Sequence, residues 1–572
     1  MSIASLDFPR LESRLRRLYG QRCDEALPLV VDAINRVNLS EVDQSSDERW
    51  NQRDVVLITY GDQIQSAERN PLQTLLQFLV EWDLPGLFST VHFLPCFPYT
   101  SDDGFSVVDY RTIDPNLGAW EDIDSVSDVS TLMLDFVVNH VSQSSQWFQD
   151  YLAGHLPYLK YFIEADPHAD LSAVTRPRSL PLLSEFETSR GQRWLWTTFS
   201  RDQVDLNYAE PTVLAEVIEI LLEYVRHGAR IIRLDAIAYL WKQTGTSCIH
   251  LPETHEVVKL LRDVMQTVAP HVLLLTETNV PHEENVSYFG DGDEAHVVYQ
   301  FSFPPLLLDA FLNEDAEPLK NWLANLQSPP PGATYLNFTA SHDGIGVRPL
   351  EGRISTERLA RLVDKIKQRG GLIGTRRQSD GTDSPYELNI SYVDALSNLD
   401  GDPNSHAARF LASQAVMLAL QGVPAVYFHS LVGTQNDLEG VETSGTPRRI
   451  NRRKFDIGEL SARINDNGTL QNAIFSGLRH LLGVRIEQPA FHPDAGQEYV
   501  ESGAPNLLVF RRSCSRSGQS ILVAVNFGDN DEEFDLPAQF VASLDLLGST
   551  INVHNGRLGL APAQVVWLTK ES

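Results

Sequence analysis

Basic residues are scarce in this sequence. Its 46 Lys and Arg residues are outnumbered by 76 Asp and Glu residues, which gives a formal net charge of −30 at pH 7. A field of that sign repels nucleic acid and anionic membrane surfaces at long range. We therefore expect neither as a partner. A small anionic substrate would need a local group of arginines to overcome this field.

Cysteine is nearly absent. The four cysteines are far apart and form no CxxC motif or Cys/His ligand spacing; they are Cys23, Cys96, Cys248 and Cys514. This pattern excludes a disulfide framework and indicates no zinc site. The first residues hold no apolar stretch followed by a small-residue cleavage site. Together these features predict reduced thiols and a cytoplasmic protein.

Long uncharged apolar runs are missing, with one exception. Residues 410–428 form a stretch of 19 residues without a charge, which is near the length of a membrane span. Ser413 and Gln414 make it partly polar, and Gly422 and Pro424 divide it. We predict a buried helix followed by a buried strand rather than a span.

Short β-branched apolar runs recur along the chain, and most follow a helical pattern. Because their hydrophobicity is continuous rather than alternating, we expect strands covered on both faces, as in parallel sheets. The eight runs are residues 55–60, 90–95, 131–137, 230–235, 272–277, 296–301, 334–339 and 425–428. At 572 residues, the chain can hold one barrel-sized domain with insertions or two to four separate units. Eight strands alternating with helices predict a (β/α)₈ barrel.

One helix of the barrel is clearly delimited. Pro211 begins it, apolar residues repeat every three or four positions, and Gly228 ends it. Between and beyond the barrel segments the pattern changes, which predicts inserted subdomains after the third and seventh strands and a C-terminal antiparallel β domain. The expected units are an N-terminal helical extension (1–50), three barrel parts (51–151, 201–344, 406–482), two insertions (152–200, 345–405) and the C-terminal β domain (483–572).

Charged residues stand where these buried strands end. Arg233 and Asp235 lie in the apolar run that ends at residue 235, and Glu277 ends a later run. Asp135 lies near the end of the third run and Asp343 just past the seventh. Isolated buried charges cost several kcal/mol unless they are paired or used. Since the active sites of such barrels form at the carboxyl ends of the strands, these residues are candidates for catalysis.

Four stretches carry a family resemblance: DFVVNH (135–140), RLDAIAY (233–239), TETN (276–279) and SHD (341–343). In this order, and with QVDLNY (203–208) before the second, they resemble the α-amylase superfamily of retaining α-glucoside enzymes, from about residue 51 onward. The resemblance implies that Asp235 is the nucleophile, Glu277 the general acid/base, and Asp343 the carboxylate that grips sugar hydroxyls. Retention independently requires two carboxyl groups about 5 Å apart.

Other residues near these motifs have roles that the resemblance implies. Arg233 lies on the same face of the strand as Asp235 and is expected to keep it ionised by pairing with it. His140 and His342 would hydrogen-bond the glucose ring, although a lone histidine such as His140 can equally be a satisfied core residue. Asp135 is either a hydrogen-bonding group of the barrel mouth or a direct substrate contact.

Within the superfamily, the sucrose phosphorylase group is the more similar. The matching segments include LPCFPYTSDDGFSVVDY (94–110), TRPR (175–178), YELNISYVDAL (386–396) and INRRKF (450–455). They place Asp102 and Arg452 on the far hydroxyls of one glucose unit, which argues against a polysaccharide substrate. They also place further glucose contacts at Phe105, Phe199, Gln203 and Tyr239.

Phosphorolysis requires cations near the glucosyl ester. Water is present at about 55 M and cellular phosphate at about 10 mM, so bound phosphate must gain about 5 kcal/mol over water. Arg178 and Tyr386 match the phosphate contacts of the family, and guanidinium groups suit phosphate. Further candidates, each of which can also be an ordinary solvated charge, are Arg176, Arg448 and Arg449.

The leaving group is predicted from four further segments: 170–183, 197–208, 276–285 and 384–392. These most resemble the glucosylglycerate phosphorylases of the group, which implies cleavage of 2-O-α-D-glucosyl-D-glycerate with phosphate. Arg348 is our candidate for the glycerate carboxylate. Carboxyl groups supply every acid, base and nucleophilic role, so we expect no metal or organic cofactor.

Rival interpretations stay open. The same machinery could take sucrose, sucrose 6'-phosphate or glucosylglycerol, or could act as a hydrolase or transglucosylase. A catalytically dead barrel that serves as a scaffold would be expected to lack one of the carboxylates, and all three are present at positions 235, 277 and 343. The oligomeric state is not predicted.

Overall fold

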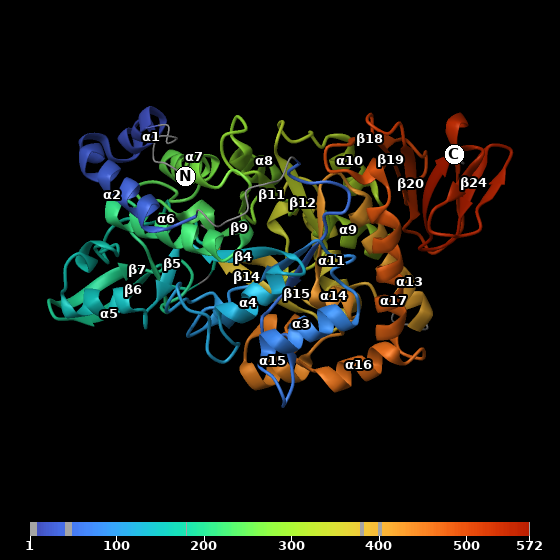
Figure 1. Ribbon diagram of the computed structural model, residues 1–572. Coiled ribbons are helices and arrows are strands. Elements are labelled where there is room, and N and C mark those ends of the chain that lie inside the picture. The colour runs from blue at the N-terminus through green and yellow to red at the C-terminus, as the bar shows by residue number, and fades with distance from the viewer. Residues whose placement is uncertain (1–7, 40–47, 179, 378–381, 398–402, 571–572) are drawn as a thin grey trace.

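A computed structural model describes residues 8–39, 48–178, 180–377, 382–397 and 403–570. Eight parallel strands close into a barrel at its centre (Figure 1). They are β1 (Val56–Thr59), β3 (Thr90–Phe93), β4 (Thr131–Val137), β9 (Ala229–Asp235), β10 (Leu273–Thr276), β11 (Val297–Tyr299), β12 (Thr334–Phe338) and β16 (Val423–Tyr427). Each strand overlaps one of the predicted apolar runs, and the predicted fold class is confirmed.

The barrel strands are buried on both faces. All residues of β1, β3, β10, β11, β12 and β16 are buried, because side chains fill the interior and helices cover the outside. The covering helices are α3 (Pro71–Glu81), α4 (Trp120–Ser127), α6 (Pro211–Arg226), α7 (Pro252–Val268), α9 (Phe303–Asn313), α10 (Glu317–Ala324), α13 (Pro403–Ala419) and α17 (Leu470–Ile486).

Two predictions about individual helices are confirmed. Helix α6 begins at Pro211 and ends at Arg226, two residues before Gly228, whose φ of 86° turns the chain into β9. The uncharged run 410–428 divides into α13 and β16, both inside the protein. No helix in the described residues is long and apolar enough to cross a membrane.

Two insertions, after β4 and after β12, lie over the carboxyl end of the barrel. After β4 come β5 (His140–Ser142), α5 (Gln146–Ala153), the antiparallel hairpin β6 (Leu183–Thr188) and β7 (Gly191–Trp196), and β8 (Gln203–Asp205), which pairs with β5. After β12 come β13 (Ile345–Gly346), α11 (Thr356–Gln368), β14 (Leu372–Arg377) and β15 (Asp383–Asn389), and the three strands form one sheet. Residues 179, 378–381 and 398–402 of the predicted insertions lie outside the described residues.

The N-terminal helices α1 (Phe8–Tyr19) and α2 (Cys23–Arg36) pack on α7 and α6, as Figure 1 shows at the blue end of the chain. Arg14 anchors α1, because its guanidinium lies 3.0 Å from Asp263, 3.3 Å from Glu256 and 2.9 Å from Asp293. A hydrogen-bonded charge network of this kind ties the helix to the barrel. Residues 1–7 and 40–47 of the predicted extension lie outside the described residues.

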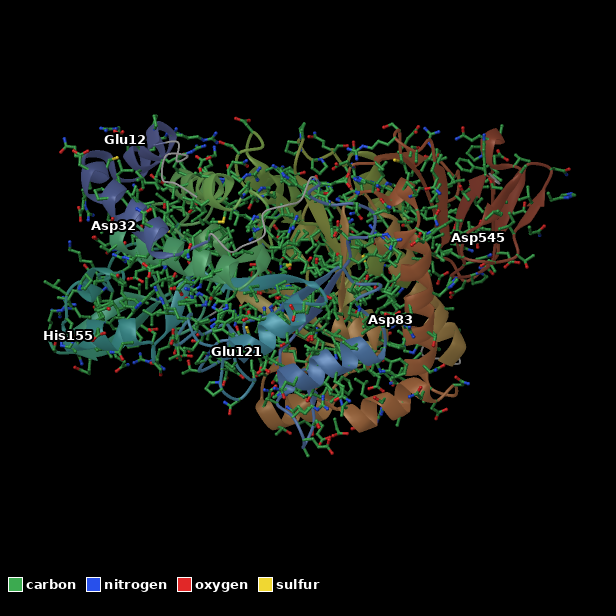
Figure 2. The ribbon with its side chains drawn as sticks, in the orientation of Figure 1. Glu12, Asp32, Asp83, Glu121, His155 and Asp545 are labelled. Carbon is green, nitrogen blue, oxygen red and sulfur yellow. The ribbon has the colours of Figure 1, made fainter. Side chains whose placement is uncertain are left out.

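The C-terminal strands, red in Figure 1, form two antiparallel sheets. The five-stranded sheet is β18 (Gly496–Val500), β19 (Leu507–Ser513), β20 (Ser520–Asn526), β25 (Val565–Lys570) and β22 (Ser543–Asp545). The three-stranded sheet is β21 (Glu532–Asp535), β24 (Arg557–Leu560) and β23 (Asn552–His554). Acidic side chains such as Asp32, Asp83 and Glu121 project from the outer helices and their ends (Figure 2).

Candidate active site

Three carboxyl groups meet at the carboxyl end of the barrel. Asp235 is the last residue of β9, Glu277 follows the last residue of β10, and Asp343 lies in the loop after β12. All three line one pocket of about 710 Å³. The structure therefore brings the predicted catalytic residues together.

The backbone of neighbouring strands positions Glu277 beside Asp235. Thr276 pairs with Leu234, and the amide of Glu277 donates to the carbonyl oxygen of Leu234 at 3.1 Å. Ala236, which follows Asp235, has a φ of 51°, a left-handed conformation that is unfavourable for a residue with a Cβ. In this conformation its amide donates to Glu277 Oε2 at 3.0 Å.

Arg233 is buried beneath the pocket and joins two carboxylates. Its Nη1 lies 2.8 Å from Asp235 Oδ1 and 2.7 Å from Asp135 Oδ1. Burial alone would raise the pKa of Asp135, but Arg233 and His92 lower it below its usual value. Asp135 does not line the pocket. Of the two roles left open for it, the hydrogen-bonding role in the barrel mouth fits its position.

The protonation of the carboxyl pair follows from its surroundings. Burial raises the pKa of Asp235, Arg233 opposes this shift, and the charge of Glu277 adds to it. Burial also raises the pKa of Glu277. Interacting carboxyl groups hold their protons as a pair. Because Arg233 hydrogen-bonds Asp235, we place a proton retained by the pair on Glu277 and the negative charge on Asp235.

Asp343 is held by an arginine that also lines the pocket. Arg448 Nη1 lies 2.6 Å from Asp343 Oδ1, and Arg448 Nη2 lies 2.9 Å from Glu387 Oε1. Glu387 Oε1 also accepts from the amide of Gly344 at 2.8 Å. Burial would raise the pKa of Asp343, but Arg448 and the neighbouring His342 hold it well below its usual range. Asp343 is therefore ionised and can accept hydrogen bonds in the pocket.

A second acidic wall comes from the short turn η3 (Asp102–Gly104). Asp102 lines the pocket and lies 3.3 Å from Arg178 Nη2. Arg452 is fully buried and does not line the pocket. Its Nη1 lies 2.7 Å from Asp103 Oδ2 and 3.7 Å from Asp102 Oδ1. Arg452 therefore supports this turn from behind through Asp103, a residue that the sequence analysis did not single out.

Aromatic rings form much of the remaining wall. Phe105 stacks on His342 with ring centroids 4.6 Å apart and planes 6° apart. Phe199 meets Tyr239 edge to face at 5.5 Å. All four residues line the pocket. Burial lowers the pKa of His342 to about 3, so its imidazole is neutral at physiological pH.

His140 and Gln203 line the same pocket and hydrogen-bond the chain around it. His140 Nε2 lies 2.8 Å from the carbonyl oxygen of Phe105, and Gln203 Nε2 donates to the same oxygen at 3.0 Å. The imidazole of His140 is hydrogen-bonded internally and also lines the pocket.

The candidate anion-binding residues divide into two sets. Arg178, Tyr386 and Arg448 line the pocket. Arg348, Arg176 and Arg449 do not. Arg348 begins the turn η7 (Arg348–Leu350) with Nε 4.0 Å from Glu351 Oε1. Arg176 hydrogen-bonds the carbonyl oxygen of Leu180, and Arg449 lies 3.4 Å from Asp103.

Some lining residues were missed by the sequence analysis. They are Pro177, Ala236, Ala238, Thr278, Asn279 and Val280. Asn279 could have been predicted, because it belongs to the TETN motif and lies three residues after the end of a barrel strand. Glu387 does not line the pocket, yet it holds both Arg448 and Gly344. Nothing in the linear sequence distinguishes it from a surface glutamate.

A parallel barrel whose strand ends hold several carboxyl groups around one polar pocket is an arrangement suited to enzymes that act on glycosides. The α-amylase catalytic-domain model matches residues 87–362. The chain is 48% identical to a glucosylglycerate phosphorylase of Allomeiothermus silvanus, over 90% of this chain and 92% of the relative. It is 43% identical to one of Escherichia coli, over 92% and 94%.

A solved structure supports the same grouping. Sucrose 6F-phosphate phosphorylase of Thermoanaerobacter thermosaccharolyticum superposes with a TM-score of 0.72 at 28% identity, over 83% of this chain and 94% of that chain. The chain belongs to the α-amylase superfamily, glycoside hydrolase family 13, in the group of its glycoside phosphorylases.

Proposed function

We propose that the protein cleaves 2-O-α-D-glucosyl-D-glycerate with inorganic phosphate to give α-D-glucose 1-phosphate and D-glycerate. The observation that carries this proposal is the likeness to glucosylglycerate phosphorylases along nearly the whole of both chains. The pocket is consistent with it, since four carboxyl groups and two arginines line the same space. The enzyme is thus a glucosyl-transferring phosphorylase.

The first chemical step forms a glucosyl ester. The Asp235 carboxylate attacks the anomeric carbon of glucose, the bond to the glycerate oxygen breaks, and Glu277 gives its proton to that oxygen. Arg233 orients the Asp235 carboxylate by donating to its Oδ1 at 2.8 Å. Asp343 accepts hydrogen bonds from the sugar hydroxyls that strengthen as positive charge develops on the ring.

The second step transfers the glucosyl group to phosphate. A phosphate oxygen attacks the anomeric carbon, the ester bond to Asp235 breaks, and the Glu277 carboxylate accepts the proton of the attacking phosphate. Each step inverts the anomeric carbon, so the product keeps the α configuration. We propose that Arg178 and Tyr386, which both line the pocket, bind the phosphate and exclude water from the ester.

The glucose-binding roles follow from the same positions. We propose that Asp102, His140, Gln203 and His342 hydrogen-bond the sugar and that Phe105, Phe199 and Tyr239 form its walls. These residues line one pocket. Arg452 acts indirectly, because it holds the Asp102 turn through Asp103. The chemistry uses carboxyl groups alone, so no metal or organic cofactor enters the proposed mechanism. A phosphorylated product that is retained inside the cell favours the cytoplasm.

The test is acceptor specificity in the synthetic direction. Purified enzyme is incubated with α-D-glucose 1-phosphate and either D-glycerate, D-fructose or glycerol, and released phosphate is measured. We expect kcat/KM to be greatest with D-glycerate and the product to be the α-glucoside. Greater activity with fructose or glycerol would move the protein to another phosphorylase specificity. Release of free glucose alone would make it a hydrolase.

A further inference from the structure

We propose that Arg448, held from behind by Glu387, binds the carboxylate of D-glycerate and thereby selects an anionic acceptor. This inference rests on the proposed function and names the residue that distinguishes glycerate from neutral acceptors of similar size.

The contacts of Arg448 leave a defined part of its guanidinium for a ligand. Nη2 and Nε lie 2.9 Å and 3.3 Å from the two carboxylate oxygens of Glu387, and Nη1 lies 2.6 Å from Asp343 Oδ1. An arginine has five N–H donors, so these contacts with described residues leave two. Because Glu387 grips one edge of the planar group, the other edge has a fixed orientation toward the pocket that Arg448 lines.

Arg448 lines the same pocket as Glu277. In the substrate, the carboxylate is one carbon–carbon bond from the carbon that bears the glycosidic oxygen, and Glu277 protonates that oxygen. The pKa of Tyr386 reports what surrounds its ring: burial raises it to about 12, Glu387 and Glu277 add to the rise, and Arg448 and Arg178 oppose it. Arg448 and Glu277 therefore both lie within electrostatic range of Tyr386, which also lines the pocket.

The two other candidate arginines fit the glycerate carboxylate less well. Arg178 is paired with Asp102 at 3.3 Å, and 32% of its side chain is exposed. It also matches a phosphate contact of the family, and phosphate arrives after glycerate has left. Arg348 does not line the pocket. Arg448 is 18% exposed, and a less exposed guanidinium binds an anion with less competition from water.

The pairing of Arg448 with Asp343 also explains a preference for anions. When glucose binds, its hydroxyls become the hydrogen-bonding partners of Asp343, so Arg448 shares that carboxylate with the sugar. An acceptor carboxylate can accept charge-assisted hydrogen bonds from the two remaining donors of the guanidinium, and these bonds are stronger than those of a neutral hydroxyl group. A site whose donors are satisfied only when a carboxylate binds discriminates against ligands that lack one.

The experiment compares acceptors for one glucosyl-enzyme. α-D-Glucosyl fluoride serves as the donor, because its leaving group has no carboxylate. D-Glycerate, glycerol and phosphate are the acceptors, and kcat/KM is measured for each. The variants are Arg448→Gln, Arg348→Gln and Glu387→Gln. Arg453→Gln is the matched control, because Arg453 is 38% exposed, pairs with Glu459 and lies in the same segment.

We expect Arg448→Gln to lower kcat/KM for D-glycerate about 100-fold relative to glycerol, and to lower the value for phosphate much less. Glu387→Gln should lower the glycerate-to-glycerol ratio of kcat/KM by about 10-fold, because it weakens the hydrogen bonds that hold the guanidinium of Arg448 without removing that guanidinium. Arg348→Gln and Arg453→Gln should keep the glycerate-to-glycerol ratio.

Several outcomes overturn the inference. Equal losses with all three acceptors would assign Arg448 a general structural role, and a greater loss with phosphate would make it a phosphate ligand. A loss of glycerate specificity in Arg348→Gln alone would transfer the role to Arg348. In each of these cases a wild-type enzyme that prefers glycerate leaves the proposed function standing. A wild-type enzyme that does not use D-glycerate at all would overturn both.

Discussion

Replacing Lys242 by methionine tests the buried ion pair that supports the pocket loops. Lys242 Nζ lies 2.7 Å from Asp205 Oδ2 and donates to Asn139 Oδ1 at 2.6 Å. The two charged side chains are 2% and 0% exposed. Burial lowers the pKa of Lys242, while Asp205 opposes that shift. Lys242, which follows the short turn η5 (Ile237–Tyr239), is therefore joined to β8, which holds Gln203 and Asp205, and to Asn139, which precedes β5 and His140.

The size of the expected loss of stability depends on which contacts Asp205 keeps after Lys242 is replaced. Removing one partner of a buried pair costs about 3–5 kcal/mol, because it leaves the other charge uncompensated. Asp205 keeps hydrogen bonds from the amide and hydroxyl of Thr198, at 2.9 Å and 2.5 Å, and these offset part of the loss. We expect Lys242→Met to lower the free energy of unfolding by about 3 kcal/mol.

Urea unfolding followed by tryptophan fluorescence measures this change. The double variant Lys242→Met/Asp205→Asn should recover about half of the loss, because it removes the orphaned charge. Lys160→Met is the control: Lys160 is 57% exposed and lies 3.8 Å from Glu210, so it should cost less than about 1 kcal/mol. A Lys242→Met protein no less stable than the control, or a double variant no better than the single, would refute the reasoning.

Three further predictions concern catalysis. Burial raises the pKa of Glu277, so kcat/KM for glucosylglycerate should fall as pH rises through that pKa and the acid loses its proton. This fall in kcat/KM at high pH should disappear in Glu277→Gln assayed with α-D-glucosyl fluoride. If the fall persists in that variant, another group is responsible for it. Arg178→Gln should raise KM for phosphate about 10-fold or more while sparing hydrolysis of α-D-glucosyl fluoride, whereas parallel losses would argue against a phosphate contact. Asp103→Asn removes the charged partner that lies 2.7 Å from Arg452. It should raise KM for every glucosyl donor by a common factor of about 10 and leave KM for phosphate unchanged. An effect on KM for phosphate alone would contradict the glucose-side position of the η3 turn.

Much of the fold could be predicted because it depends on local patterns. The eight barrel strands could be identified as continuous apolar runs, because a strand covered on both faces needs no polar positions. The candidate catalytic carboxyl groups could be identified in the sequence for a related reason. A charge such as Asp235, at the end of such a run, has no partner nearby in the sequence other than Arg233 and must therefore be used or paired.

The contacts that shape the anion and glucose subsites were not predictable in this way. Arg448 and Glu387 are 61 residues apart, and Arg452 and Asp103 are 349 residues apart. An arginine in a loop has the same sequence signature whether it faces solvent or a pocket. Arg348 and Arg448 were both candidates, and only the path of the loops after β12 and β16 separates them.

The sequence by itself therefore determined the barrel, the strand ends and the carboxyl groups on them, because burial of apolar residues within each short segment dictates these features. The tertiary structure alone decided which arginines enter the pocket and which carboxylates hold them. Those pairings are set by the packing of distant loops against one another, and no local pattern of residues encodes the distance between two loops.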